Sequence, residues 1–325
     1  MRQIRISVVV PLYGEEESVA RLVHEVDAAL AGEVYELILV NDGSADATAS
    51  VINTMCQEFS AVTGIHFQRN YGQTAALQAG LVAARGEFVV YMDGDLQTDP
   101  CDILPMVEKL EAEGLDMVNG WRKQRQDARL TRNFPSMVAN GMIKFFTGLA
   151  LHDNGCPMKV MRQWVAKGLH LYGEQHRFIA ALAAINGAKV GEMVVHHRAR
   201  QFGVSKYGLG RTFRVLVDLL LVLFFQRFTD RPLQLFGTGG LFAFAIGFAI
   251  DGWLTADKLL LGAELAGRPM LLLGSLLLLS GMLLFGIGLV LEVQMRTYYE
   301  STGQQVYRIK SRSGECVSRV DIKEN

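Results

Sequence analysis

The first part of the chain, residues 1–205, alternates short apolar runs with segments of helical spacing. Four runs are rich in β-branched or aromatic residues and end at turn residues, which is typical of buried strands. These expected strands cover residues 4–10, 35–40, 65–67 and 88–92. The expected helices between them cover residues 18–30, 45–59 and 74–84. Regular alternation of strand and helix predicts an α/β fold, a mostly parallel sheet with helices on both faces.

Beyond Leu209 the apolar density rises sharply. Residues 233–250 and 269–291 contain no charged side chain, and uncharged stretches of this length predict transmembrane helices. Two buried helices of a soluble core are the alternative. The loop between them has few basic residues, whereas both flanks are rich in arginine and lysine. By the positive-inside rule both flanks are cytoplasmic, so the two helices form a hairpin that anchors a cytosolic domain.

The stretch before the hairpin, residues 209–228, mixes arginines and one aspartate with leucines and aromatic residues. This composition favours a helix lying in the membrane interface, with a third span as the alternative. A third span would place the basic C-terminal end outside, against the positive-inside rule. The sequence thus divides into four parts. They are a cytosolic domain with a Rossmann-like sheet (1–208), an interfacial region (209–231), two transmembrane helices (232–292) and a cytosolic tail (293–325).

Composition narrows the function classes. A net charge of −1 over 325 residues argues against a nucleic-acid binder, which normally carries a basic excess. The four cysteines are widely spaced, which suits reduced thiols better than a disulfide frame or a zinc site. The apolar run near the N-terminus is too short for a signal peptide. No G-x-G-x-x-G follows the first strand and no phosphate-loop motif occurs, which argues against dinucleotide-binding enzymes and phosphate-loop NTPases.

The best candidate for chemistry follows the fourth expected strand. The sequence M-D-G-D-L-Q places Asp93 and Asp95 one residue apart, with Gln97 two residues later. Ligands of open α/β sheets bind just beyond the carboxyl ends of the strands. Carboxylate oxygens at that place suit a hard divalent cation that meets a diphosphate. A plain surface turn is the alternative, since Asp and Gly favour turns.

Polar or aromatic residues also follow the other three expected strands. They are Pro11, Tyr13 and Glu15 after the first, Asp42 after the second, and Arg69 and Asn70 after the third. Because the carboxyl ends of parallel strands share one edge of the sheet, these residues are expected to line a single crevice. There Asp42 can accept from a base N–H and Tyr13 can stack on the base. Turn chemistry explains each residue singly, but acidic groups at the ends of three of the four strands favour a binding site.

The pair His196 and His197 raises a metal or general-base interpretation. The pair closes an apolar run that reads as a strand, G-E-M-V-V-H-H. Adjacent side chains of a strand point to opposite faces, so the two rings are not expected to act together.

With these motifs the sequence resembles the family 2 glycosyltransferases of GT-A fold, in particular their polyprenyl-phosphate glycosyltransferase group. Five blocks occur in that group's order and spacing: V-V-V-P-L-Y-G-E-E, V-N-D-G-S-A-D, R-N-Y-G-Q, M-D-G-D-L-Q-T-D-P and R-A-R-Q-F-G-V-S-K-Y. The resemblance extends over almost the whole chain. It is greatest to the bacterial undecaprenyl-phosphate glucosyl and aminoarabinosyl transferases, and dolichol-phosphate mannose synthase is a more distant relative.

The resemblance implies a role for each matching residue. Those that would bind the nucleotide sugar are Pro11, Tyr13, Glu15, Asp42, Asn70 and Asp93. Asp95 and Gln97 would hold Mg²⁺ or Mn²⁺ against the diphosphate. Those that would bind phosphate groups of donor and acceptor are Arg122, Arg132, Arg200, Ser205 and Lys206, with Arg129 as an alternative to Arg132. Asn41 and Gly94 stand where relatives commonly have Asp and Ala, at positions whose side chains these roles do not need.

The implied activity is inverting transfer of a sugar from a nucleotide-diphospho-sugar, expected to be a UDP-sugar, to undecaprenyl phosphate. The place is the cytoplasmic face of the bacterial inner membrane, and relatives suggest a homo-tetramer. A polyprenyl phosphate is already an anion near pH 7, so the reaction needs positive groups to position it and no strong general base. The alternatives are a GDP-mannose-dependent transferase, a processive polysaccharide synthase and a non-catalytic lipid-carrier subunit. The synthase motif Q-x-x-R-W is absent, and the intact acidic motif argues against the non-catalytic subunit.

Overall fold

The computed structural model describes residues 3–123, 149–171, 173, 175–198, 232–262, 264 and 268–302. The chain forms two compact units, residues 1–223 and 224–325, which are described separately. The interfacial region expected at 209–231 lies outside the described residues.

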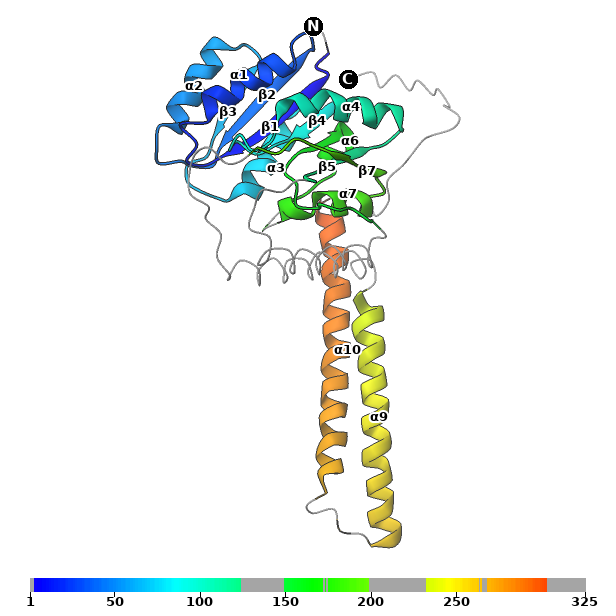
Figure 1. The fold of residues 1–325 in the computed structure, drawn as a ribbon. Coiled ribbons are helices and arrows are strands. Elements are labelled where there is room, and N and C mark those ends of the chain that lie inside the picture. Colours follow the sequence, from blue (N-terminus) through cyan, green and yellow to red (C-terminus); the bar gives the residue numbers. More distant parts are fainter. Residues whose placement is uncertain are drawn as a thin grey trace, which may run out of the picture. The chain divides into compact units, whose positions relative to one another are not determined.

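A seven-stranded sheet forms the centre of the first unit (Figure 1). The strand order is β3-β2-β1-β4-β6-β5-β7. The strands are β1 (Ile6–Leu12), β2 (Tyr35–Asn41), β3 (Val62–His66), β4 (Phe88–Tyr91), β5 (Met117–Trp121), β6 (Lys159–Arg162) and β7 (Val190–Val194). Every neighbouring pair is parallel except those of β6, which runs antiparallel to β4 and β5. The predicted mostly parallel α/β sheet is confirmed.

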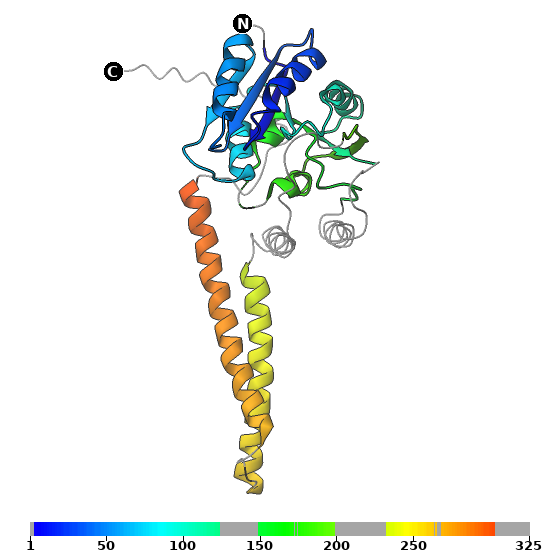
Figure 2. The same ribbon diagram turned by 60° about the vertical axis from the view of Figure 1, so that its left-hand side comes forward.

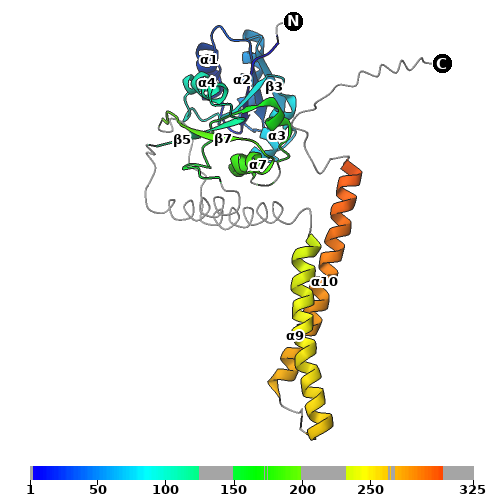
Figure 3. The ribbon, with the colours of Figure 1, turned by 90° about the vertical axis from the view of Figure 1, so that its right-hand side faces the viewer.

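The central strand β1 shows why both faces of the sheet are covered. Its side chains alternate between two cores, as the period of two of a strand requires. Val8 and Val10 pack in one core and Val9 in the other. The first core is covered by α1 (Val19–Ala29), α2 (Thr48–Glu58) and α4 (Ile103–Ala112). The second is covered by α3 (Gln73–Ala83), α6 (Gln163–Lys167) and α7 (Ile179–Ile185) (Figure 3).

Two strands were not among the expected ones. Strands β5 and β6 are five and four residues long, and polar residues interrupt both. Asn119 and Lys159 are nevertheless almost completely buried. The Asn119 side-chain amide donates to the Asp153 carbonyl, and Lys159 donates to backbone carbonyls of the loop that precedes β6. A periodicity argument cannot anticipate such partners. Two short 3₁₀ helices, η1 (Pro100–Asp102) and η2 (Gln175–Phe178), complete the described part of this unit.

The second unit is a pair of long helices, α9 (Pro232–Leu261) and α10 (Pro269–Thr302). Both are long and apolar enough to cross a membrane. They pack against each other over much of their length (Figures 1 and 2). Glycines permit the close approach, because a Cβ at Gly240 would lie 2.7 Å from the carbonyl oxygen of Gly281. A Cβ at Gly247 would lie 2.6 Å from that of Gly274.

The expected spans, residues 233–250 and 269–291, lie inside these helices, but both helices continue beyond them. Helix α9 does not end at Asp251. Ser275 of α10 donates a hydrogen bond to the Asp251 carboxylate at 3.2 Å, so this acid is accommodated within the helix pair. Residues 293–302 of the expected tail belong to α10. Large apolar side chains on both helices are exposed, as expected of surfaces that face lipid.

A compact polar network closes the amino ends of the central strands. Glu36 of β2 is buried, and its carboxylate accepts hydrogen bonds from the Ser7 hydroxyl at 2.6 Å and the Arg85 backbone N–H at 2.7 Å. The Arg85 guanidinium donates to the same carboxylate at 2.6 and 2.9 Å. Burial alone would raise the pKa of Glu36, but these donors outweigh it and lower the pKa below its ordinary value.

We expect this network to make stability depend on pH. Because the pKa of Glu36 is lower in the folded protein, its contribution is present above the ordinary pKa of 4.5 and is lost as the pH falls below it. The thermal midpoint of the detergent-solubilised protein should therefore fall more between pH 5 and pH 3 for the natural protein than for Glu36→Gln. Glu33→Gln is the control, because the Arg5–Glu33 ion pair is only partly buried and is expected to contribute less. Identical pH profiles for Glu36→Gln and the natural protein would contradict this account.

Candidate active site

The carboxyl ends of β2, β1 and β4 are adjacent in the sheet, and the polar residues predicted to form a crevice follow these ends. Register places Leu12 beside Asn41, and the Asp42 N–H donates to the Leu12 carbonyl at 2.8 Å. Asp42 therefore lies next to Tyr13, the first residue after β1. The Tyr13 side chain is 45% exposed, which leaves its ring accessible to a base.

Asp42 connects the end of β2 to the start of α3. It is 2% exposed, and its two carboxylate oxygens accept the backbone N–H groups of Tyr71 at 2.7 Å and Gly72 at 2.9 Å. Gly72 has φ 97°, a conformation that favours glycine, and it directly precedes α3. A carboxylate has about four acceptor positions, so Asp42 can still accept from a nucleoside. Its first structural effect, however, is to hold the loop that begins α3.

Asp93 follows β4 and is held by two side chains. Its Oδ1 atom accepts from Gln73 Nε2 at 2.8 Å and from the Tyr91 hydroxyl at 2.9 Å. Burial of the carboxyl group, together with the nearby charge of Asp95, raises the pKa of Asp93 to about 6. A cation bound beside these two acids would favour their ionised forms.

Asp95 and Gln97 lie on a tight turn. Asp95 Oδ1 accepts the Gln97 N–H at 3.2 Å, and Leu96 between them has φ 60°, which is unusual for a residue with a side chain. A Cβ at Gly94 would overlap the side chain of Leu12, so alanine would not fit there without a shift. Gly94, which stands where relatives commonly have alanine, thus leaves room for the Leu12 side chain of this protein.

The donor atoms of this turn suit a hard cation. Carboxylate and amide oxygens are typical ligands of Mg²⁺, which is usually bound by one or two carboxylates and completed by substrate phosphates. Among the described residues no cluster of three or more His, Cys, Asp or Glu side chains forms a complete metal site. Asp95 and Gln97 offer a carboxylate and an amide oxygen of this kind on one turn.

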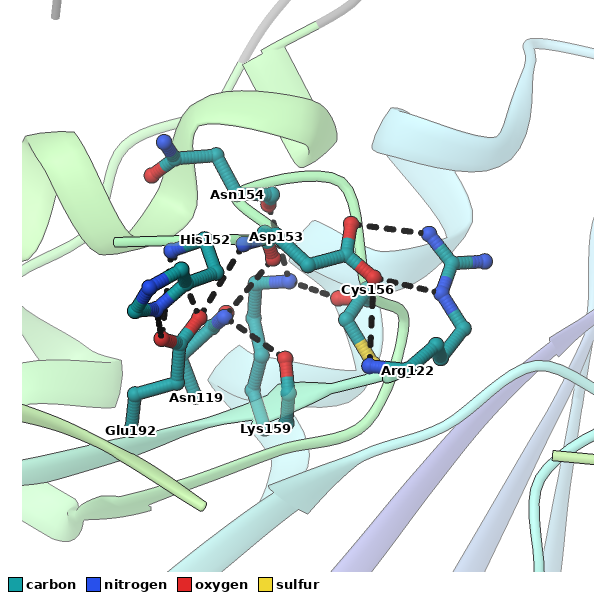
Figure 4. A network of polar contacts seen from close by, with 9 residues as sticks. Asn119, Arg122, His152, Asp153, Asn154, Cys156, Lys159 and Glu192 are labelled. Carbon is teal, nitrogen blue, oxygen red and sulfur yellow. Dashed lines mark hydrogen bonds and ion pairs between the residues drawn. The ribbon is translucent and has the colours of Figure 1, made fainter. Parts of the chain in front are cut away.

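Arg122 follows β5 and forms a buried ion pair with Asp153 (Figure 4). Its Nε and Nη2 atoms donate to the two carboxylate oxygens at 2.7 and 3.0 Å. Burial alone would lower the pKa of Arg122, but the hydrogen bonds and charge of Asp153 raise it. The guanidinium therefore stays charged, with much of its charge balanced by Asp153.

The loop that carries Asp153 is fixed from several sides (Figure 4). Glu192 of β7 accepts the backbone N–H groups of His152 and Asp153, each at 3.0 Å through one oxygen. Asn119 of β5 donates to the Asp153 carbonyl at 2.8 Å. Lys159 of β6 is 1% exposed and donates to the Cys156 carbonyl. Sequence reasoning missed these residues; a lysine inside the apolar run M-K-V-M was the one visible signal.

The remaining predicted residues are placed as follows. Pro11 is buried within β1 beside Val40. The Glu15 carboxylate accepts from the Ser18 hydroxyl at 2.7 Å, close to the start of α1. Asn70 is exposed after β3, next to Arg69, whose guanidinium lies over the Tyr71 ring. Arg132, its alternative Arg129, Arg200, Ser205 and Lys206 lie outside the described residues.

The two neighbouring histidines behave as separate residues. His196 pairs with Asp102 at 2.8 Å, which raises the pKa of the imidazole, whereas His197 forms a backbone bridge with Thr98. Arg198 follows and donates its N–H to the Gln97 carbonyl at 2.8 Å and its guanidinium to Asp99 at 2.5 Å. This segment therefore fastens the turn that carries Asp95 and Gln97.

Residues 7–169 match the family described as Glycosyl transferase family 2. A dodecaprenyl-phosphate galacturonate synthase of Rhizobium johnstonii is 45% identical over 315 residues, which are 95% of this chain and 93% of that protein. The chain belongs to glycosyl transferase family 2. The resemblance to its polyprenyl-phosphate branch is confirmed. An undecaprenyl-phosphate 4-deoxy-4-formamido-L-arabinose transferase of Pseudomonas aeruginosa is 36% identical over 90% of this chain and 86% of that protein.

Solved structures support the fold. Glucosyl-3-phosphoglycerate synthase from Mycobacterium tuberculosis, in complex with Mn²⁺, UDP and its product, superimposes with a TM-score of 0.54. The identity is 20%, and the match covers 68% of this chain and 80% of that one. The same enzyme has also been solved with Mg²⁺ and UDP, at the same TM-score. The family's catalytic fold is thus present in this chain.

We expect the Arg122–Asp153 pair to be a major contributor to stability. Asp153→Asn leaves the guanidinium without its anion in a buried place, which typically costs about 3–5 kcal/mol. The thermal midpoint in detergent should fall by roughly 10 °C. The double variant Arg122→Met/Asp153→Leu should recover much of this loss, because it removes both charges together.

The control for this experiment is His152→Ala. His152 adjoins Asp153 but its side chain is largely exposed, so a much smaller shift is expected. A single Asp153→Asn variant as stable as the natural protein would contradict the role given to the ion pair.

Proposed function

We propose that this protein transfers a sugar from a nucleotide-diphospho-sugar to the phosphate of a polyprenyl lipid, with inversion at the anomeric carbon. One observation carries the proposal. Asp42, Asp93 and Asp95 converge at adjacent strand ends of a family 2 domain, in a chain that aligns over nine-tenths of its length with transferases named for polyprenyl phosphates.

On the donor side, the crevice offers a surface for each part of a nucleotide. Tyr13 is exposed enough to stack on the base, and Asp42 has acceptor capacity for a base N–H. Asp93 would accept from a hydroxyl of the ribose or the sugar. The nucleotide is proposed to be UDP, which the solved relative binds in its structure.

Asp95 and Gln97 would hold Mg²⁺ or Mn²⁺ against the diphosphate. When bound, such a cation acts as a Lewis acid that stabilises the negative charge on the departing nucleotide. Arg122, which follows β5, is close enough to interact electrostatically with Asp93, and it adds positive charge there. Two of the five N–H groups of the Arg122 guanidinium donate to Asp153. The remaining ones are proposed to donate to a phosphate oxygen.

On the acceptor side, the nucleophile is already an anion. A phosphate oxygen does not need a strong general base, and the proposed partners are cations that position it electrostatically. These partners are Arg132, Arg200, Ser205 and Lys206, taken from the sequence motifs. In-line attack from the face opposite the leaving nucleotide gives inversion.

The anchoring follows from the substrate. Helices α9 and α10 are proposed to cross the inner membrane as a hairpin, with the sheet domain and both flanks on the cytoplasmic side. A lipid phosphate then reaches the domain while its chain stays in the bilayer. We further propose that the protein is a homo-oligomer, as the family resemblance suggests.

The names of the relatives suggest which donor sugars to test first. The Rhizobium johnstonii relative is named for galacturonate, and the Pseudomonas aeruginosa relative for a formamido-arabinose. Nucleoside diphosphate release should be measured with undecaprenyl phosphate and a panel of UDP-galacturonate, UDP-glucose, a UDP-amino-arabinose derivative and GDP-mannose. We expect a UDP-sugar to be used in preference to GDP-mannose. Preference for GDP-mannose would support the mannosyltransferase alternative.

We expect Asp95→Ala to lower transfer to polyprenyl phosphate by on the order of 10²-fold, because cation and carboxylate act together on the leaving diphosphate. Glu87→Gln is a matched control, since Glu87 is an exposed acid at the opposite end of the same strand β4. The measurement is formation of lipid-linked sugar from labelled donor. An undiminished rate for Asp95→Ala would refute the metal role.

We also expect removal of residues 209–325 to abolish transfer to a long-chain lipid phosphate in vesicles, because the domain loses its attachment to the bilayer. The control for folding is UDP binding by the truncated protein, measured by calorimetry. A truncated protein that binds UDP and retains full activity on the long-chain lipid would overturn the anchoring argument.

A further inference from the structure

Asp93, Gln73 and Tyr91 form a closed triangle of hydrogen bonds. Gln73 Nε2 donates to Asp93 Oδ1 at 2.8 Å and to the Tyr91 hydroxyl oxygen at 3.1 Å. The Tyr91 hydroxyl in turn donates to Asp93 Oδ1 at 2.9 Å. The two hydrogens of the Gln73 amide thus serve two acceptors, and both donors to Asp93 meet the same oxygen.

Tyr91 is a rigid member of this triangle. It is the last residue of β4 and is 2% exposed, packed in the core beneath α3. The Lys159 ammonium lies 5.9 Å from the centre of its ring, which suits a cation–π contact. The hydroxyl therefore has little freedom to point elsewhere.

Gln73 is held equally firmly, from the neighbouring element. It is the first residue of α3, and the two residues before it donate their backbone N–H groups to Asp42. Its position therefore depends on the carboxylate that follows β2. Through Gln73, the end of β2 and the end of β4 share one hydrogen-bonded network.

Such a network has a clear physical effect on Asp93. Two donors on Oδ1 fix the rotation of the carboxyl group, and they stabilise its charge beside Asp95. The location of Oδ2 is then determined as well, because the carboxylate is planar. A group that must accept from one hydroxyl of a bound nucleotide gains affinity when it is oriented in advance.

We propose that Gln73 and Tyr91 are positioning residues for the nucleotide sugar, which orient Asp93 so that its second oxygen meets a hydroxyl of the ribose or the sugar. The inference rests on the proposed function, because the contact between Asp93 and the donor belongs to it. Neither residue is expected to touch the reacting atoms.

The test is a double-mutant cycle read out by UDP binding. The full-length protein in detergent is titrated with UDP at fixed MgCl₂ by isothermal calorimetry, as the natural protein and as Tyr91→Phe, Gln73→Leu and Asp93→Ala. Tyr91→Phe and Gln73→Leu should each weaken UDP binding by about five- to tenfold, the effect of losing a hydrogen bond of typical strength. In the Asp93→Ala background the same substitutions should change binding by less than about twofold.

A second readout separates positioning from general damage. In the transfer assay, Tyr91→Phe should raise the KM for the nucleotide sugar and leave the KM for polyprenyl phosphate unchanged. Tyr35→Phe is the matched control, because it deletes another tyrosine–aspartate hydrogen bond, to Asp27 at 2.5 Å, at the amino end of β2. It should leave UDP affinity unchanged.

Each outcome has a distinct meaning. Asp93→Ala with natural UDP affinity and an unchanged KM for the nucleotide sugar would overturn the donor role that the proposed function gives to Asp93. If Asp93→Ala binds UDP more weakly but Tyr91→Phe and Gln73→Leu bind it with natural affinity, the positioning inference alone is overturned. Equal losses in the natural and Asp93→Ala backgrounds would also overturn it, because the two residues would then act through packing and not through the carboxylate.

Discussion

Buried carboxylates at one edge of a sheet must be compensated, and the way in which this protein compensates them organises its site. A carboxylate removed from water is costly unless donors or cations replace the lost hydration. Asp42 is satisfied by two backbone N–H groups, Asp93 by two side chains, and Asp153 by a guanidinium. Each solution recruits a different element, so the acids fix the positions of α3, β4 and the loop before β6 relative to one another.

The opposite edge of the sheet is built for stability. There Glu36 accepts hydrogen bonds from Ser7 of β1 and from Arg85, two residues after the end of α3. At the carboxyl edge the compensation is less complete, since burial of the Asp93 carboxyl group, together with the nearby charge of Asp95, raises the pKa of Asp93. A site of that kind gains from a cation and a bound nucleotide, whereas the amino edge does not. This is the usual distribution in open α/β sheets, whose ligands meet the carboxyl ends of the strands.

The proposed acceptor explains why the described residues of the site include acids and the Arg122 guanidinium but no obvious general base. A lipid phosphate is already ionised, so the protein has only to bring it close and balance its charge. Two long apolar helices in the same chain suit a substrate whose tail stays in the bilayer. The ion pair with Asp153 keeps the buried Arg122 guanidinium charged and fixes its position.

Much could be predicted from local patterns. Buried strands, the mostly parallel sheet, the apolar helices and the acidic motif after β4 are all encoded by short stretches whose period or composition has a direct physical meaning. Strands β5 and β6 could not be predicted in this way, because their polar residues are buried by contacts that no apolar period shows. Asn119 donates to the Asp153 carbonyl far along the chain, and Lys159 donates to backbone carbonyls of the loop before β6. For the same reason Arg122 could be recognised as a candidate cation but not as the partner of Asp153, 31 residues later.

The sequence by itself determined which acids lie at strand ends, since strand and turn signals are local. Only the tertiary structure decided the hydrogen-bond partners of each acid. Asp42 accepts from the backbone at the start of α3, and Gln73 and Tyr91 donate to Asp93. Local patterns specify where a side chain leaves the backbone. The donors that reach it come from other elements, and their arrival depends on how the sheet and its helices pack.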